Sequence, residues 1–145
     1  MNAERKRLVQ ESWESIVGNH DAVAVAFYER LFEIDAGARE MFAKTNMVAQ
    51  RWKFVQMLGE IVSNLDMPRE LIPTVSALGR RHVDYGVRDA DYDRVREALF
   101  AALASQVGAG FTDDVRDAWE EAYALTAAVM KRGAHTGASA PSATS

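Results

Sequence analysis

Apolar residues recur at spacings of three and four along most of this chain, and this periodicity constrains its fold more than any other feature. The clearest run comprises Phe54, Val55, Leu58, Ile61, Val62 and Leu65. Further runs begin at Val9, Tyr92 and Val115, and no segment alternates apolar and polar residues as a half-buried strand does. The sequence therefore predicts an all-α fold of about six to eight helices.

Start and stop signals divide these runs. Asp35 predicts a break, Gly86 a turn and Thr112 the start of the last helix, while Pro68 and Pro73 predict short helical pieces. From about Gly133 the composition shifts to small residues, GAHTGASAPSATS, which bury too little apolar surface to become ordered. We therefore expect one domain over 1–133 and a flexible tail over 134–145.

Composition excludes several classes of function. The 145 residues carry a net charge of -4, with Lys and Arg scattered among Asp and Glu, so nucleic acid is not an expected partner. The absence of cysteine excludes disulfides, thiolate metal sites and iron-sulfur ligation. No signal-like apolar run and no membrane-length apolar stretch occurs, so we expect a cytoplasmic protein that does not bind membranes.

His82 is the one histidine with an inward position. It shares a helical face with Val75 and Leu78, whereas His20 and His135 adjoin turn-like and tail-like stretches and are expected to be solvated. Spacing alone favours a hydrogen-bonded core histidine over a ligand. No zinc pattern such as H-E-x-x-H supplies further donors. A lone inward histidine suits a cofactor that brings its own equatorial ligands, as haem does.

Five segments resemble one family in order and spacing. They are F-Y-E-R-L-F at 27–32, R-E-M-F at 39–42, Q-R-W-K-F-V-Q-M-L at 50–58, L-G-R-R-H-V-D-Y-G-V at 78–87 and A-W-E-E-A-Y at 118–123. Over residues 4–132 the chain resembles the globins, most closely the single-domain bacterial haemoglobins related to the haem domain of flavohaemoglobins. The resemblance implies a globin fold around haem b, with His82 as the iron ligand.

The resemblance also implies how the haem is held. Gln50 precedes His82 by 32 residues, which fits a distal and a proximal helix on opposite sides of a flat cofactor. Lys53 and Arg81 resemble contacts to the haem carboxylates, although each is equally typical of a solvated charge. An apolar slot is predicted from Phe42, Phe54, Leu58, Leu78, Val87 and Val95, each of which alone is more often plain core.

Tyr28 and Gln50 match the family's distal positions. A hydroxyl and an amide there are suited to donating hydrogen bonds to a diatomic ligand, each contributing about 1 to 3 kcal/mol, which predicts slow oxygen release. The alternatives are a core tyrosine with its hydroxyl at the surface and a glutamine exposed on a helix. Phe54 stands where the family often has a smaller aliphatic residue, and is expected to narrow the distal pocket.

The proximal side departs from the flavohaemoglobin pattern. Tyr92 matches a tyrosine that polarises the proximal histidine together with a glutamate, but that glutamate aligns near Ala134, and no acidic residue follows Glu121. Weaker electron donation from His82 is expected, with its second ring nitrogen bonded to Tyr92 or to a backbone carbonyl.

Three functions remain open at this stage. The first is reversible binding of oxygen, nitric oxide and carbon monoxide at a pentacoordinate haem iron. The second is an enzyme activity, nitric oxide dioxygenation, with Tyr28 and Gln50 in the catalytic site and reduction by an external reductase. The third is a haemless or sensor-type globin that acts through protein contacts. Homodimer formation is also left open, because no sequence feature fixes the oligomeric state.

Overall fold

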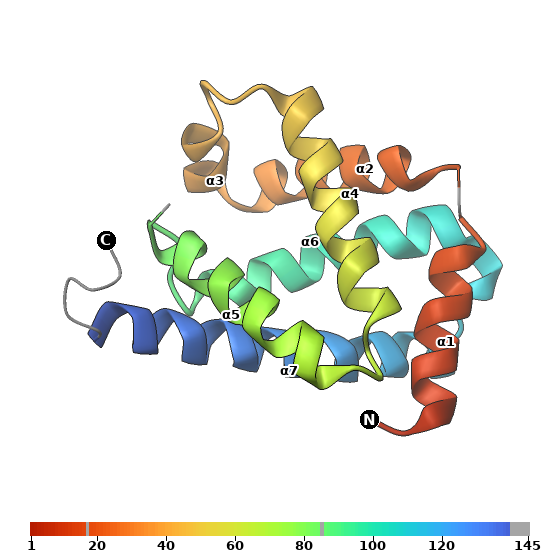
Figure 1. Ribbon diagram of the computed structural model, residues 1–145. Coiled ribbons are helices and arrows are strands. Elements are labelled where there is room, and N and C mark those ends of the chain that lie inside the picture. The colour runs from red at the N-terminus through yellow and green to blue at the C-terminus, as the bar shows by residue number, and fades with distance from the viewer. Residues whose placement is uncertain (17, 85, 140–145) are drawn as a thin grey trace.

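The computed structural model describes residues 1–16, 18–84 and 86–139, and in that part it contains seven α-helices, one short 3-10 helix and no strand. This confirms the prediction of an all-α globin fold (Figure 1). In chain order the elements are α1 Ala3–Glu14, α2 His20–Ile34, α3 Ala36–Met41, α4 Met47–Ser63, α5 Pro68–Asp84, α6 Asp91–Val107, η1 Gly108–Gly110 and α7 Asp113–Ser139.

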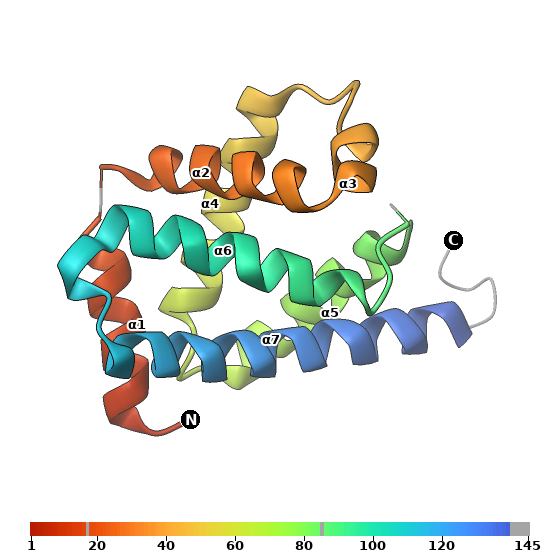
Figure 2. The same ribbon diagram turned by 180° about the vertical axis from the view of Figure 1, so that it is seen from behind.

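The helices lie in two layers. In Figure 1, α4 and α5 lie in front of α2, α6 and α7, and the reverse view in Figure 2 places α6 and α7 in front. Helix α2 packs along α6, α5 packs along α7, and α1 packs against α7 and the end of α4. This arrangement places the helix that carries Gln50 and the helix that carries His82 on the same side of the molecule.

The helix ends follow the polar signals in the sequence. Asp35 ends α2, and its side chain then accepts a hydrogen bond from the Ala38 amide to cap α3. The Thr112 hydroxyl accepts from the Val115 amide at the start of α7, and Gly86 has a φ of 88° after α5. The backbone amides at the helix starts thus gain partners that the helices themselves do not supply.

The prediction at Pro68 is confirmed and the one at Pro73 is wrong. Helix α5 begins at Pro68, but it is not a short piece, because it runs unbroken through Pro73 to Asp84. Pro73 lacks the amide hydrogen that would bond to the Arg69 carbonyl, and the helix continues despite that loss. Helix α7 continues to Ser139, past residue 134 where the sequence predicted a flexible tail, while residues 140–145 lie outside the described residues. Within this helix, Gly133 lets the backbone lie close to α5.

Apolar side chains form two clusters. The first is centred on residues from α1, α2, α6 and α7, including Val9, Val23 and Leu103, which are fully enclosed. The second is smaller and comprises Ile61, Val75, Tyr92, Ala127 and Met130. Leu65 and Tyr123 pack against both clusters, so the two adjoin along a seam.

Candidate functional site

His82 lies near the end of α5 and is half-buried. Its Nδ1–H donates to the Leu78 carbonyl over 2.8 Å, so Nε2 carries the lone pair. Burial is the main reason that the pKa of His82 lies below its usual value; the hydrogen bond to Leu78 opposes this and the Arg81 charge reinforces it. His82 is therefore a neutral imidazole, and its Nε2 has no hydrogen-bond partner among the described residues.

Two glycines hold α5 against α7. A Cβ at Gly79 would overlap the Met130 carbonyl, and a Cβ at Gly133 would lie 2.5 Å from the Ser76 carbonyl oxygen. The two backbones therefore approach more closely than any side chain would permit at these positions. Because Gly79 is three residues before His82, this contact fixes the part of α5 that carries the imidazole.

Tyr28 and Gln50 meet across α2 and α4. The Gln50 amide nitrogen donates to the Tyr28 hydroxyl oxygen over 3.0 Å. Tyr28 is only 6% exposed, and Gln50 is half-buried rather than exposed on its helix. Burial raises the pKa of Tyr28, while the bond from Gln50 partly lowers it, so the phenol keeps its proton at neutral pH. That proton has no acceptor in the described part of the chain.

Aromatic rings surround Tyr28. Phe54 stacks on Phe27 with ring centroids 4.4 Å apart, and its edge meets Tyr28 at 5.7 Å. Phe42 meets the Tyr28 ring edge-on at 5.5 Å. Such contacts restrict the tyrosine ring to one orientation. The packing of Phe54 on α2 gives it a structural role, and its effect on the width of the pocket stays a prediction.

The six predicted slot residues are all half-buried. Phe42, Phe54, Leu58 and Val95 pack on the edge of the first cluster. Leu78 and Val87 pack on the edge of the second. All six apolar side chains are thus left partly open, which fits a flat apolar group that would cover them.

Lys53 and Arg81 are both exposed, and neither forms an ion pair in residues 1–16, 18–84 and 86–139. Their cations are thus available to carboxylates at the edge of the slot. Their role as haem contacts remains a prediction.

Tyr92 does not reach His82 through a hydrogen bond. Its backbone carbonyl accepts from the Tyr123 hydroxyl over 2.7 Å, and Lys131 Nζ lies 5.1 Å from its ring centroid. Burial raises the pKa of Tyr92, and the charge of Asp89 adds to this. Of the two partners predicted for His82 Nδ1, the backbone carbonyl is thus confirmed and Tyr92 is wrong. Sequence reasoning missed Tyr123, whose helical spacing marked it only as core.

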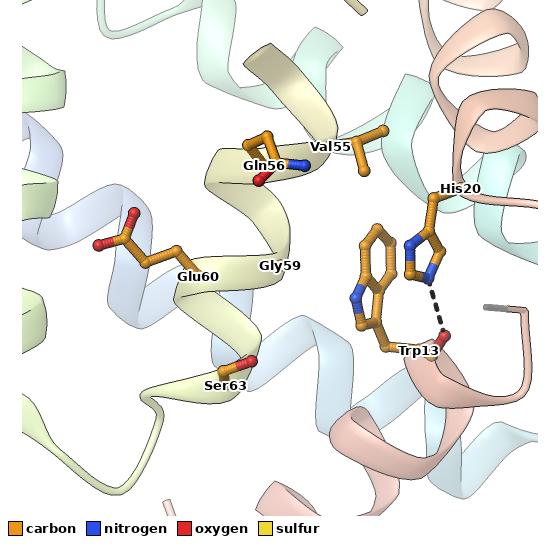
Figure 3. A pocket seen from close by; sticks show the side chains of 7 residues that line it. All are labelled: Trp13, His20, Val55, Gln56, Gly59, Glu60 and Ser63. Atoms are coloured by element: carbon orange, nitrogen blue, oxygen red, sulfur yellow. Dashed lines mark hydrogen bonds between the residues drawn. The ribbon is translucent and has the colours of Figure 1, made fainter. Parts of the chain in front are cut away.

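A pocket of about 360 Å³ lies elsewhere, where α1 and α2 meet the outer side of α4 (Figure 3). His20 lines it and is not solvated as predicted, because its ring stacks on Trp13 at 4.0 Å and its Nε2 bonds to the Trp13 carbonyl. The side chain of His135 lies outside the described residues. No group of three or more carboxylate, imidazole or thiol side chains gathers as a metal site where the chain is described.

Comparisons with known proteins agree with the fold. The family model described as globin matches residues 25–130. Neuroglobin of Danio rerio is 28% identical over 141 residues, which cover 88% of this chain and 89% of that protein. An anaerobic nitrite reductase of Oryza sativa subsp. indica is 29% identical over 147 residues, covering 88% and 91%.

Solved structures show the same fold. A hexacoordinated haem protein from an anhydrobiotic tardigrade has a TM-score of 0.84 at 16% identity, with 93% of this chain and 96% of that chain covered. An engineered carbene transferase, described as a putative nitric oxide dioxygenase from Rhodothermus marinus, has a TM-score of 0.84 at 23% identity, with 94% of each chain covered. No helix in the described ranges has the length and apolarity needed to cross a membrane.

Proposed function

This chain belongs to the globin family, and we propose that it binds haem b through His82 and takes up oxygen and other small ligands reversibly. The hydrogen bond from Gln50 on α4 to Tyr28 on α2 carries the proposal. It leaves the proton of the buried Tyr28 hydroxyl free to be donated to a ligand. When bound, haem iron supplies a coordination position for a diatomic ligand and partial electron transfer to it. A cytoplasmic location is part of the same proposal.

His82 is suited to the proximal position by its tautomer. Donation of Nδ1–H to the Leu78 carbonyl fixes the ring and leaves the Nε2 lone pair for the metal. A neutral backbone acceptor withdraws the proton less than a carboxylate would, so the imidazole stays a moderate electron donor. This favours reversible binding over oxygen activation.

Tyr28 is the stronger of the two distal donors. Its oxygen already accepts from Gln50, which polarises the O–H bond and turns the remaining proton into a better donor. Gln50 therefore supports Tyr28 as well as offering its second amide hydrogen. Helix α4 contains no histidine, which favours a pentacoordinate iron with an open ligand position.

Nitric oxide dioxygenation with an external reductase is the second candidate. The same Tyr28 and Gln50 pair would serve it, and the Rhodothermus marinus neighbour carries that description. Against it, the structure offers His82 a backbone carbonyl in place of a tyrosine and carboxylate pair. Sustained turnover of nitric oxide with a flavin reductase and NADH would support the enzyme, whereas a single oxidation without re-reduction would support binding.

Haem retention tests the proposal directly. The purified protein should show an intense Soret band, whose absence would instead support a haemless globin. His82→Ala should lose haem, and added imidazole should restore it by supplying the missing ligand. His20→Ala is the matched control, because this second half-buried histidine lies on Trp13 at the other pocket and should leave haem content unchanged. A normal spectrum in His82→Ala without imidazole would overturn the assignment.

A further inference from the structure

The outer face of α4 is apolar and uncovered at its N-terminal end. Val48 and Trp52, one helical turn apart, are 70% and 64% exposed. At 100° per residue, Val55, Gly59 and Ser63 continue the same face, while Gln50 and Phe54 lie on the opposite one. An indole exposed to this extent beside a second apolar side chain marks a contact surface rather than an isolated surface residue.

The pocket in Figure 3 lies on this same face, two turns beyond Trp52. Val55, Gln56, Gly59 and Ser63 form its α4 side, and the stacked rings of Trp13 and His20 form the other. Gly59 adds no side chain to this side of the pocket, and the Trp13 indole lies directly across from it, 3.7 Å from where a Cβ would stand. One helix face thus carries both a protruding indole and a recess walled by aromatic rings.

We propose that a second copy of this chain covers the face, with the two α4 helices antiparallel about a two-fold axis. Each Trp52 then occupies the recess above Gly59 of the partner subunit. The axis passes between Val55 and Gln56, which is the midpoint between Trp52 and Gly59. A two-fold contact is self-complementary, so one surface must provide both parts, as this surface does.

The charges along α4 favour the antiparallel arrangement. The N-terminal half and the preceding loop carry Lys44 and Lys53, together with Arg51, which already pairs with Asp21 of α2. Glu60 and Asp66 lie at the other end. Antiparallel pairing sets each basic end against an acidic end, and parallel pairing would set like charges together. The inference rests on these contacts and is independent of haem binding.

Sedimentation velocity of the full chain over a range of concentrations tests the proposal. The parent should form a dimer, with and without haem. Trp52→Ser should weaken dimerisation by about thirtyfold or more, because a buried indole at an interface centre is typically a dominant contact. Gly59→Leu, which fills the recess, should act in the same direction. Leu125→Ser is the control, since Leu125 is 50% exposed on α7, away from this face.

A disulfide then tests the orientation. The chain has no cysteine, so a single one reports on its own neighbours. Gln56→Cys lies beside the proposed axis and should form an intermolecular disulfide readily under oxidation, whereas Leu125→Cys should not. A parent that stays monomeric at all concentrations would overturn the proposal and leave the face to a different partner. A dimer indifferent to Trp52→Ser and Gly59→Leu, or equal cross-linking of the two cysteine variants, would also overturn it.

Discussion

The two helix contacts that bear the site are built differently. On the proposed proximal side, α5 and α7 meet backbone to backbone, through Gly79 at Met130 and Gly133 at Ser76. On the proposed distal side, α2 and α4 meet through side chains, with a ring stack at Phe27 and Phe54 and the bond from Gln50 to Tyr28.

The first contact determines the position of His82, and the second determines the hydrogen bonds that a ligand can receive. A backbone contact cannot adjust to an added atom without moving a helix, so it determines where His82 lies. A side-chain contact can change its hydrogen bonds while the helices stay in place, so it determines what the pocket offers a ligand. Changes to the proximal contact should therefore affect stability, and changes to the distal contact should affect ligand kinetics.

The largest effect is expected from Gly79→Ala. The added methyl group overlaps the Met130 carbonyl and must push α5 from α7, which should lower the free energy of unfolding by about 3 kcal/mol. Denaturant unfolding monitored by circular dichroism measures it. Gly59→Ala is the control, because its added Cβ meets only an ordinary van der Waals contact. Since alanine has a better helix propensity than glycine, the free energy of unfolding should stay the same or rise by up to about 1 kcal/mol. Equal stability of the two variants would contradict the argument.

Tyr28→Phe should have the next largest effect. It removes the buried donor and keeps the ring, so oxygen should dissociate about ten to a hundred times faster, equivalent to about 1 to 3 kcal/mol. Stopped-flow displacement of oxygen from the ferrous protein measures this rate. Carbon monoxide, a poorer acceptor, should be affected far less and serves as the control. An oxygen dissociation rate within a factor of two of the parent would make Tyr28 a packing residue only.

The sequence predicted what depends on periodicity. The helices and the inward position of His82 follow from spacings of three and four. Tyr28 was identified through the family resemblance instead. The sequence did not predict that α7 runs on over residues 134–139, because small residues are typical both of flexible tails and of closely packed helices. Pro73 was misread because an internal proline predicts a helix break, whereas α5 continues through it.

The sequence also did not predict which side chains from different helices would contact one another. Tyr28 and Gln50 were expected to act side by side on one ligand, whereas the structure bonds one to the other. His20 was expected in solvent, and only the fold brings Trp13 beneath its ring. Spacing indicates which face a residue occupies, but the partner on that face depends on how the helices cross.

Gln50→Leu sharpens the distal side of the comparison. If Gln50 acts chiefly by polarising and orienting the Tyr28 hydroxyl, its loss should speed oxygen dissociation by about three- to tenfold, less than the loss of Tyr28 itself. In a Tyr28→Phe background the same change should have almost no effect. The double-mutant cycle uses the same stopped-flow measurement. Additive effects would show that the amide contacts the ligand on its own.

The smallest effects on haem retention are expected from Lys53 and Arg81 at the edge of the proposed haem site. Here the proximal and distal sides should not differ. Lys53 on α4 and Arg81 on α5 are both exposed, so solvent and salt screen any bond that they make to a haem carboxylate. Lys53→Ala and Arg81→Ala should each weaken haem retention by about 0 to 1 kcal/mol, measured as the rate of haem transfer to a scavenger protein. Raising the salt concentration should reduce the difference between parent and variants, because screening weakens the parent's ion pairs. Either variant could lose haem as severely as His82→Ala. That outcome would mean that these two cations hold the cofactor, and that the close contact of α5 with α7 contributes less to haem retention than His82 requires.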